Sequence, residues 1–240
     1  MSSALHLIRT IIFYFTLTAW TVVWACIIII FIGLFPFHKR HRTFIKTWAV
    51  ITVNLCKVIC GVRWNVSGQE NIPDKPCVVM SNHQSTWETF FIQTMFSPQV
   101  QVVKQELLRV PFFGWALATT KPIAINRTDI RQSLRQIREQ GIESLKRRVW
   151  VLIFPEGTRK PHGQLGKFSR GGAGLAKAAE SKILPVAHNA GVYWPNTSWI
   201  KRPGTIQVVI GPSIDTTELS AAEATNKAKE WIAKSLSEMN

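Results

Sequence analysis

The first sixty residues differ from the rest of the chain in their pattern of hydrophobic and polar positions. Residues 11–37 carry no formal charge and are almost wholly apolar. As one helix they would measure roughly 40 Å, against about 30 Å for the hydrocarbon layer of a bilayer. A cleavable signal peptide has a shorter apolar stretch, of about 7 to 15 residues, followed by a small-residue cleavage site. The pattern therefore predicts a hydrophobic membrane-anchoring helix.

A basic cluster and a second apolar segment follow this stretch. We expect residues 38–42 (HKRHR) to lie on the cytoplasmic side, where they can also meet anionic head groups. Residues 43–60 have a helical, apolar pattern but contain Lys46 and Lys57, which favours an interfacial or re-entrant helix over a second span. Hydropathy leaves open whether the first helix crosses the membrane or dips in and returns. The expected location is the inner, cytoplasmic membrane, with the remaining chain on its cytoplasmic side.

From residue 61 onward, short apolar runs alternate with amphipathic segments. The expected strands are residues 62–66, 76–80, 100–103, 122–125, 149–154, 183–187 and 205–210. The expected helices are residues 86–95, 129–148, 172–181 and 217–239. This alternation indicates an α/β fold with a mostly parallel sheet flanked by helices. We therefore divide the chain into a membrane-anchoring helical segment, residues 1–60, and an α/β domain, residues 61–240.

Residues 81–88 (SNHQSTWE) lie where the strand expected at residues 76–80 gives way to a helix. With His83 in the loop and Glu88 in the first helical turn, the carboxylate can reach one ring nitrogen and fix the tautomer. The other nitrogen is then free to take a proton, as in general-base catalysis. The alternative is that Ser85 and Glu88 form an S-x-x-E capping box, in which Glu88 bonds the backbone at the helix start.

Residues 151–159 (VLIFPEGTR) form the second informative stretch. Four apolar residues form a buried strand, Pro155 ends it, and Glu156, Gly157 and Arg159 project from the loop that follows. Loops at the carboxyl ends of parallel strands build binding sites. An arginine there is suited to grip a phosphate with two parallel hydrogen bonds. The alternative is a solvated loop arginine paired with Glu156.

Lys104 follows the strand expected at residues 100–103, and it could offer a second positive charge to an anionic substrate. The alternative is a surface lysine paired with Glu106. A little further along, the three aromatic side chains of residues 112–115 (FFGW) are either core residues or membrane-facing apolar surface. Gly114 indicates a close approach of the backbone.

The net charge of +15 and the pI near 10.2 point to an anionic partner. Nucleic acid is disfavoured because no binding motif is recognised and the chain is tied to a bilayer. Residues 121–170 hold twelve Lys or Arg and four Asp or Glu, a local balance of +8. The helix expected at residues 129–148 carries a basic stripe and an apolar stripe, formed by Arg131, Arg135 and Arg138 and by Ile130, Leu134 and Ile137. The basic stripe is either a solvated face or a contact with anionic lipid.

The cysteine pattern indicates neither a metal site nor a disulfide framework. The four cysteines show no C-x-x-C pair and no histidine spacing suited to zinc. Cys56 and Cys60 share a helix face, but two ligands do not make a metal site. We expect reduced packing cysteines facing a cytoplasmic compartment.

Four blocks of residues resemble, in the same order, those of the lysophosphatidic acid acyltransferase (1-acylglycerol-3-phosphate acyltransferase) family. The blocks are residues 82–85 (NHQS) with an acid five positions after the histidine, residues 104–115 (K-x-E-L-x-x-x-P-x-x-G-W), residues 154–159 (FPEGTR) and residues 184–187 (LPVA). Each block alone is weak, but four in order across roughly residues 60–212 are strong.

The resemblance implies transfer of a fatty acyl group from acyl-CoA or acyl carrier protein to the sn-2 hydroxyl of lysophosphatidate, giving phosphatidate. These donors are substrates, and no cofactor is implied. His83 would be the general base, and Glu88 would orient its ring and stabilise the imidazolium. No covalent acyl-enzyme is needed, so neither Ser85 nor any cysteine is assigned as a nucleophile. The family's usual acid at position 88 is aspartate. Either a small loop shift absorbs the extra methylene of Glu88, or Glu88 mainly caps the helix and its pairing with His83 is looser.

The same resemblance implies that Arg159 binds the acceptor phosphate, with Glu156, Gly157 and Thr158 completing the binding loop and Lys104 helping. The lysolipid and the product both partition into membrane lipids, which suits an anchored enzyme. Two other functions stay open at this point. One is a lysophospholipid acyltransferase for a different head group, and the other is a non-catalytic lipid-binding membrane protein.

Overall fold

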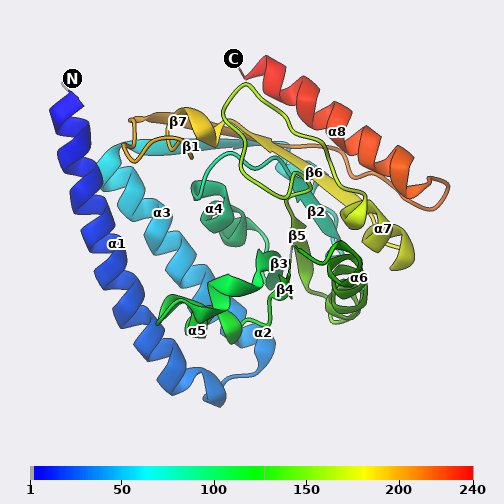
Figure 1. The fold of residues 1–240 in the computed structure, drawn as a ribbon, viewed down its shortest axis with the longest axis horizontal. Helices are drawn as coiled ribbons and strands as arrows, with labels where there is room; N and C mark the ends of the chain where they lie inside the picture. Colours follow the sequence, from blue (N-terminus) through cyan, green and yellow to red (C-terminus); the bar gives the residue numbers. More distant parts are fainter. Residues whose placement is uncertain (1–2, 127, 240) are drawn as a thin grey trace.

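The computed structural model describes residues 3–126 and 128–239, and its centre is one seven-stranded sheet (Figure 1). The strands are β1 (Val62–Ser67), β2 (Val78–Ser81), β3 (Gln99–Lys104), β4 (Ile123–Ile125), β5 (Trp150–Ile153), β6 (Ile183–His188) and β7 (Gly204–Ile210). Their order across the sheet is β1-β7-β6-β2-β5-β3-β4, and all neighbours are parallel except β6 and β7. The predicted mostly parallel α/β fold is therefore confirmed.

Helices connect and flank these strands. The α-helices of this part are α4 (Trp87–Met95), α5 (Phe113–Ala118), α6 (Ile130–Lys146), α7 (Gly171–Ala178) and α8 (Ala221–Glu238). Short 3-10 turns lie at η3 (Gln69–Asn71), η4 (Gln105–Arg109) and η5 (Ala190–Val192). The side chain of Asp129 accepts a hydrogen bond at the start of α6, and Ser220 with Glu223 forms a capping box on α8. Both helices therefore begin one residue after a capping side chain.

Both faces of the sheet are covered, and alternate residues of a strand serve opposite layers. In β2, Val79 belongs to the core cluster on the side of α3 and α4, whereas Val78 and Met80 belong to the cluster on the side of α6, α7 and α8. Strands buried on two faces read as continuous apolar runs. For this reason the central strands could be recognised from the sequence as apolar runs.

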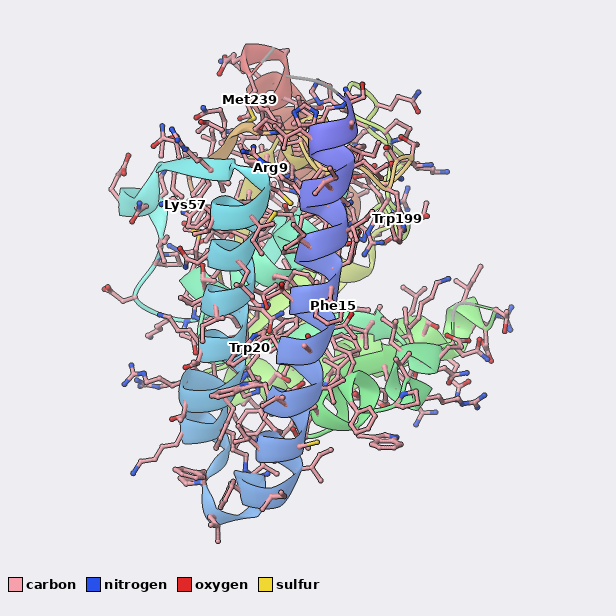
Figure 2. The ribbon with its side chains drawn as sticks, turned by 90° about the vertical axis from the view of Figure 1, so that its left-hand side faces the viewer. Arg9, Phe15, Trp20, Lys57, Trp199 and Met239 are labelled. Carbon is pink, nitrogen blue, oxygen red and sulfur yellow. The ribbon has the colours of Figure 1, made fainter. Side chains whose placement is uncertain are left out.

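The amino-terminal sixty residues form a helical hairpin (Figure 2). Its first arm is α1 (Ser3–Phe31), which ends in the 3-10 turn η1 (Ile32–Leu34). Its second arm is helical from Phe37 to Cys60 and consists of α2 (Phe37–Arg40), the π-helical η2 (His41–Ile45) and α3 (Lys46–Cys60). By length and composition, Ser3–Leu34 and Phe37–Cys60 could each cross a membrane. The apolar amino-terminal segment is thus compatible with membrane association.

The hairpin lies along one flank of the α/β part (Figure 1). Phe13 of α1 and Val53 of α3 are buried in the same cluster as sheet residues such as Leu184. Gly61, with φ +74°, ends α3, and β1 begins at the next residue. The division of the chain into two domains at residues 60 and 61 stays a prediction.

Two details of the sequence interpretation were wrong, the start of the second helical arm and the packing of Cys26. The second helical arm begins at Phe37, so residues 38–42 form its first turns; His41 is buried, with its Nε2 3.3 Å from the Thr120 carbonyl. Pro36 precedes the arm and nothing after it interrupts the helix. On α6, Ile137 of the apolar stripe is buried, whereas Ile130 and Leu134 are exposed at 70% and 45%. All four cysteines are free thiols, but Cys26 is exposed, whereas the other three are buried.

Candidate functional site

Loops from four neighbouring strands meet at one edge of the sheet. His83 follows β2, Lys104 ends β3, residues 154–159 follow β5, and His188 ends β6. These four strands are mutually parallel neighbours, so their carboxyl ends lie on the same edge. The structure therefore brings together the residues that the sequence placed in three separate blocks.

His83 and Glu88 form a hydrogen-bonded pair at this edge. The Nδ1 atom of His83 lies 2.8 Å from Oε1 of Glu88. The same oxygen accepts hydrogen bonds from the backbone N–H groups of Gln84 at 2.9 Å and Ser85 at 2.8 Å. The orienting and capping roles of Glu88, which the sequence presented as alternatives, are thus performed together by one carboxylate oxygen.

The electrostatics of the pair favour an ionised Glu88. Its side chain is completely buried, and burial alone would raise the pKa of the carboxyl group. The neighbouring imidazoles of His188 and His83 and the hydrogen bonds to the carboxylate outweigh burial, so the pKa of Glu88 lies below its ordinary value. An ionised carboxylate accepts the Nδ1 proton of His83. The Nε2 lone pair of His83 is then available to take a proton.

A second buried histidine holds the loop that carries His83. Asn82 donates from Nδ2 to the His188 carbonyl at 2.9 Å and accepts at Oδ1 from the His188 backbone N–H at 3.0 Å. The ring of His188 donates from Nε2 to the Asn82 carbonyl at 2.9 Å, and its Nδ1 accepts from the Ala190 N–H at 3.3 Å. Both ring nitrogens are therefore satisfied in the neutral tautomer, and burial lowers the pKa of His188. We call this arrangement the Asn82–His188 clamp.

The loop after β5 supports the backbone of the His83 loop. Glu156 accepts the His83 N–H at 2.8 Å through Oε1 and the Gly166 N–H at 2.7 Å through Oε2. The Lys160 N–H donates to the His83 carbonyl at 2.7 Å. Glu156 is half-buried, and burial raises its pKa against the effect of these two hydrogen bonds. In this structure the Glu156 carboxylate joins the two loops.

Arg159 is fixed at one end and exposed at the other. Its Nε donates to the Ser85 carbonyl at 3.0 Å, which aims the exposed guanidinium at the His83 loop. Within the described ranges the ion pairs are His83–Glu88, Arg135–Glu139 and Arg147–Glu143. The alternative pairings, Arg159 with Glu156 and Lys104 with Glu106, are therefore not formed.

Gly157 and Thr158 form the exposed tip of this loop. Gly157 has φ +68°, a conformation that side chains with a Cβ rarely adopt, so the turn itself favours glycine here. No atom lies within 4 Å of the position of an added Cβ, so the space beside Gly157 is open. A ligand can therefore approach the backbone of the loop closely.

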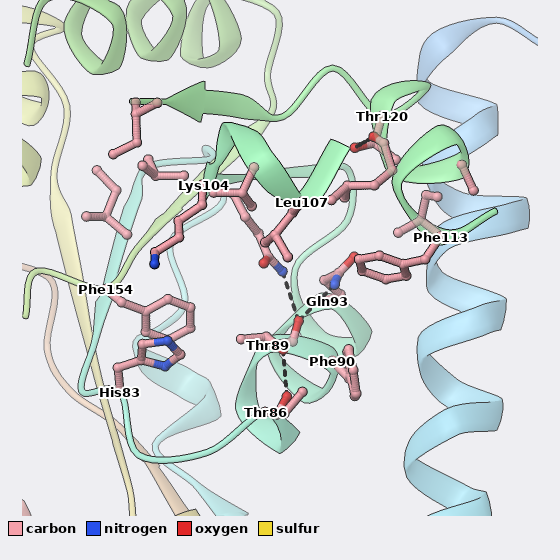
Figure 3. A pocket seen from close by; sticks show the side chains of 18 of the residues that line it. His83, Thr86, Thr89, Phe90, Gln93, Lys104, Leu107, Phe113, Thr120 and Phe154 are labelled. Carbon is pink, nitrogen blue, oxygen red and sulfur yellow. Dashed lines mark hydrogen bonds between the residues drawn. The ribbon is translucent and has the colours of Figure 1, made fainter. Parts of the chain in front are cut away.

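Phe154 is a site residue that the sequence reasoning missed. Its ring stacks on His83 with centroids 4.1 Å apart and an interplanar angle of 17° (Figure 3). The sequence interpretation treated it as the last residue of a buried strand, but β5 ends at Ile153. Phe154 thus gives the imidazole one apolar face. No sequence pattern distinguishes this stacking partner from a core residue.

His83 lies at one end of a cavity of about 780 Å³ (Figure 3). At this end the lining includes Lys104, Phe154 and residues 157–159. Polar side chains line its middle, namely Thr86, which precedes α4, and Thr89 and Gln93 of α4. The far end is apolar and comes from the hairpin and α5, through Trp24, Ala25, Ile28, Ile45, Trp48, Phe113, Ala116 and Leu117. Cationic groups, the imidazole of His83 and an apolar compartment thus share one cavity.

The acyltransferase family model matches residues 63–189, which include β1 to β6 and the paired His83 and Glu88. The chain belongs to the acyltransferase family. The resemblance predicted from the sequence is therefore confirmed. This acyltransferase is 49% identical to the 1-acyl-sn-glycerol-3-phosphate acyltransferase of Pseudomonas aeruginosa, over 99% of this chain and 94% of the relative.

More distant relatives agree with this assignment. The 1-acyl-sn-glycerol-3-phosphate acyltransferase of Borreliella burgdorferi is 31% identical over 77% of this chain and 74% of its own. Among solved structures, the 1-acyl-sn-glycerophosphate acyltransferase PlsC from Thermotoga maritima superimposes with a TM-score of 0.83. It is 25% identical, and the match covers 100% of this chain and 98% of that one. The likeness includes the amino-terminal hairpin as well as the sheet.

Proposed function

We propose that this acyltransferase moves a fatty acyl group from a thioester donor to the sn-2 hydroxyl of lysophosphatidate, forming phosphatidate. The observation that carries the proposal is the position of the His83–Glu88 pair in one cavity with cationic and apolar ends. The acceptor of this reaction has the same three parts, which are a phosphate, a hydroxyl and an acyl chain. The names of the relatives support the same acceptor.

In the proposed reaction His83 is the general base. Its Nε2 takes the proton of the sn-2 hydroxyl while the hydroxyl oxygen attacks the thioester carbonyl carbon. The new C–O bond forms, the C–S bond breaks, and the proton passes from the imidazolium to the departing thiolate. Glu88 stabilises the imidazolium through the Nδ1–H bond of 2.8 Å. No side chain becomes acylated in this sequence.

The cationic end of the cavity holds the acceptor phosphate in this proposal. Arg159 is exposed, and within the described residues its guanidinium is anchored through Nε, so the other N–H groups can grip phosphate oxygens. Lys104 points into the cavity toward Phe154 and His83 (Figure 3) and adds a second positive charge. Gly157 and Thr158 let the phosphate approach the loop backbone. The apolar end, lined by α1, α3 and α5, receives an acyl chain.

The membrane orientation and the donor belong to the same proposal. The enzyme works at a bilayer where the lysolipid resides, on the cytoplasmic side of the inner membrane, and the exposed apolar residues of α1 support its contact with the bilayer. Acyl-CoA or acyl carrier protein brings the acyl group there as a substrate. Both donors are anionic, which suits the net charge of +15.

The deciding experiment is an acyl-transfer assay in detergent micelles with lysophosphatidate and with lysolipids that have neutral head groups. We expect lysophosphatidate to be preferred and His83→Ala to lower kcat by about a hundredfold or more. A matched control is His162→Ala, because His162 is an exposed histidine of the loop region after β5. Equal rates with neutral lysolipids would overturn the proposed acceptor, and an unchanged His83→Ala rate would overturn the base.

A further inference from the structure

A short segment outside the hairpin exposes four large apolar side chains. This segment runs from the start of η4 (Gln105–Arg109) to the end of α5 (Phe113–Ala118), and we call it the η4–α5 segment. Its exposed side chains are Leu107 at 39%, Val110 at 43%, Phe112 at 37% and Trp115 at 50% relative exposure. Single exposed apolar residues are ordinary on protein surfaces. Four within nine positions are more than such single residues, and exposed apolar patches mark interaction sites.

This patch adjoins the apolar surface of α1. Ala116 of α5 is buried in a cluster with Ala25 and Ile28 of α1. Both views place α5 beside α1, near the end of that helix that leads into the hairpin turn (Figures 1 and 2). In that part of α1, Ile30 and Phe31 are themselves exposed, at 68% and 46%. The η4–α5 segment therefore extends the apolar face of the hairpin.

The same segment is a wall of the cavity. Leu107, Phe113 and Leu117 line it, and Leu107 and Phe113 point toward its centre (Figure 3). Leu107 is both exposed and cavity-lining, so one side chain connects the outer apolar patch with the interior. An acyl chain crossing at this place would remain in contact with apolar atoms throughout.

The backbone conformation of the η4–α5 segment keeps its apolar side chains exposed. Gly114 packs against the carbonyl groups of Leu107 and Leu108, where any Cβ would collide, so α5 lies directly on η4. Phe112 has φ +59°, which is a strained conformation for a bulky residue, and its exposed ring packs against that of Trp115 at 5.4 Å. Strain that does not serve core packing indicates a functional constraint on this loop.

We infer that the η4–α5 segment dips into the bilayer beside α1 and forms the portal through which acyl chains pass between the membrane and the cavity. The inference rests on the proposed function, because it assigns the entry route of that site. The partner is the hydrocarbon layer of a lipid bilayer. In this arrangement the indole of Trp115 would lie at the interface that such rings prefer, and the exposed cations Arg109, within the segment, and Lys121, three residues after it, would reach anionic head groups.

Charged substitutions on the outer patch test the portal. Val110→Asp and Trp115→Asp change side chains that do not line the cavity. Each variant is assayed with long-chain lysophosphatidate in vesicles and with a short-chain, water-soluble lysophosphatidate. We expect the apparent KM for the vesicle substrate to rise by about tenfold or more, with the soluble substrate changed less than about twofold. Ile130→Asp is the matched control, since Ile130 is 70% exposed on α6, across the sheet.

Equal losses with both substrates would mean damage to the cavity and would overturn the inference, as would equal losses in the Ile130→Asp control. A wild-type enzyme that fails to acylate either lysophosphatidate would instead refute the proposed function, so the two failures are distinguishable.

Direct contact with the bilayer is measured with an environment-sensitive fluorophore. Cys26 is replaced by Ala to remove the exposed thiol, and the label is attached at Val110→Cys or at Ile130→Cys. Vesicles of anionic phospholipid should shift the emission of the label at position 110 to the blue and leave the label at position 130 unchanged. No shift at position 110, or an equal shift at both positions, overturns the portal.

Discussion

The Nδ1 atom of His83 lies 2.8 Å from Oε1 of Glu88, and the same oxygen accepts the backbone N–H groups of Gln84 and Ser85 in the loop that precedes α4. The longer side chain of glutamate reaches the imidazole and the backbone at once. The departure from the family's usual aspartate therefore needs no choice between a catalytic and a structural role. Because the two roles share one atom, they are separable only by changing the charge while keeping an acceptor oxygen.

The substitution Glu88→Gln separates the orienting role of Glu88 from its capping role. The amide keeps an oxygen that can accept from Gln84 and Ser85, but it removes the negative charge that stabilises imidazolium. We expect kcat to fall by about a hundredfold or more, while the melting temperature stays within about 4 °C of the wild type. Steady-state kinetics and thermal unfolding in the same detergent check both numbers. A large loss of stability with little loss of rate would show that capping is the dominant role.

Arg159 is expected to act on acceptor binding. Arg159→Ala removes the guanidinium and its bond to Ser85, so KM for lysophosphatidate should rise by about tenfold or more, with a smaller change in kcat. Arg159→Lys keeps the charge but cannot grip a phosphate through two parallel bonds, so we expect an intermediate KM. Arg138→Ala is the matched control, since it removes an exposed arginine of α6. A fall in kcat alone would contradict phosphate binding.

Strand positions and the order of the site blocks were legible in the sequence for one physical reason. A sheet covered on both faces requires uninterrupted apolar runs, and each run ends where polar loop residues such as His83 begin. The carboxyl ends of neighbouring parallel strands lie at the same edge of the sheet, so the loops that follow them meet there. The alternation of elements thus predicted both the fold class and the meeting of His83 with Arg159.

Contacts that depend on exact side-chain placement could not be predicted. The Asn82–His188 clamp joins residues 106 positions apart, and the stacking of Phe154 on His83 depends on where β5 ends. Hydropathy also could not show that the second helical arm starts at Phe37, because a basic run next to an apolar segment resembles a loop. Likewise, an apolar stripe such as Ile130 and Leu134 shows which face could be buried, but not whether a neighbour covers it.

The Asn82–His188 clamp predicts a pH dependence of stability. Burial lowers the pKa of His188 below the ordinary value of 6.5, whereas the unfolded chain keeps that ordinary value. Between 6.5 and the lower folded pKa the unfolded state therefore binds more protons, so the free energy of unfolding falls as pH drops below 6.5. Protonation at Nδ1 would also break the bond from Ala190.

The test compares the wild type with His188→Gln, which can still donate to the Asn82 carbonyl but does not titrate. Denaturant unfolding from about pH 7.5 to about pH 5.5 should show a shallower decline for the variant, with the difference confined to the range below the ordinary histidine pKa. Parallel curves for the two proteins would exclude His188 as the titrating group.

The apolar end of the cavity predicts a change in acyl-chain preference. Ala116 faces this compartment from α5, and a larger side chain there shortens the space available to an acyl chain. We expect Ala116→Leu to raise KM for substrates with long acyl chains by about tenfold while leaving short-chain substrates nearly unchanged, since each methylene kept out of an apolar site costs about 0.8 kcal/mol. A series of acyl donors and of lysophosphatidates, varied one at a time, identifies which of the two chains occupies the compartment. Ala178→Leu at the end of α7 is the control outside the cavity. An equal rise for every chain length would mean that the substitution disturbs the His83 end, and the apolar end would then not be an acyl compartment.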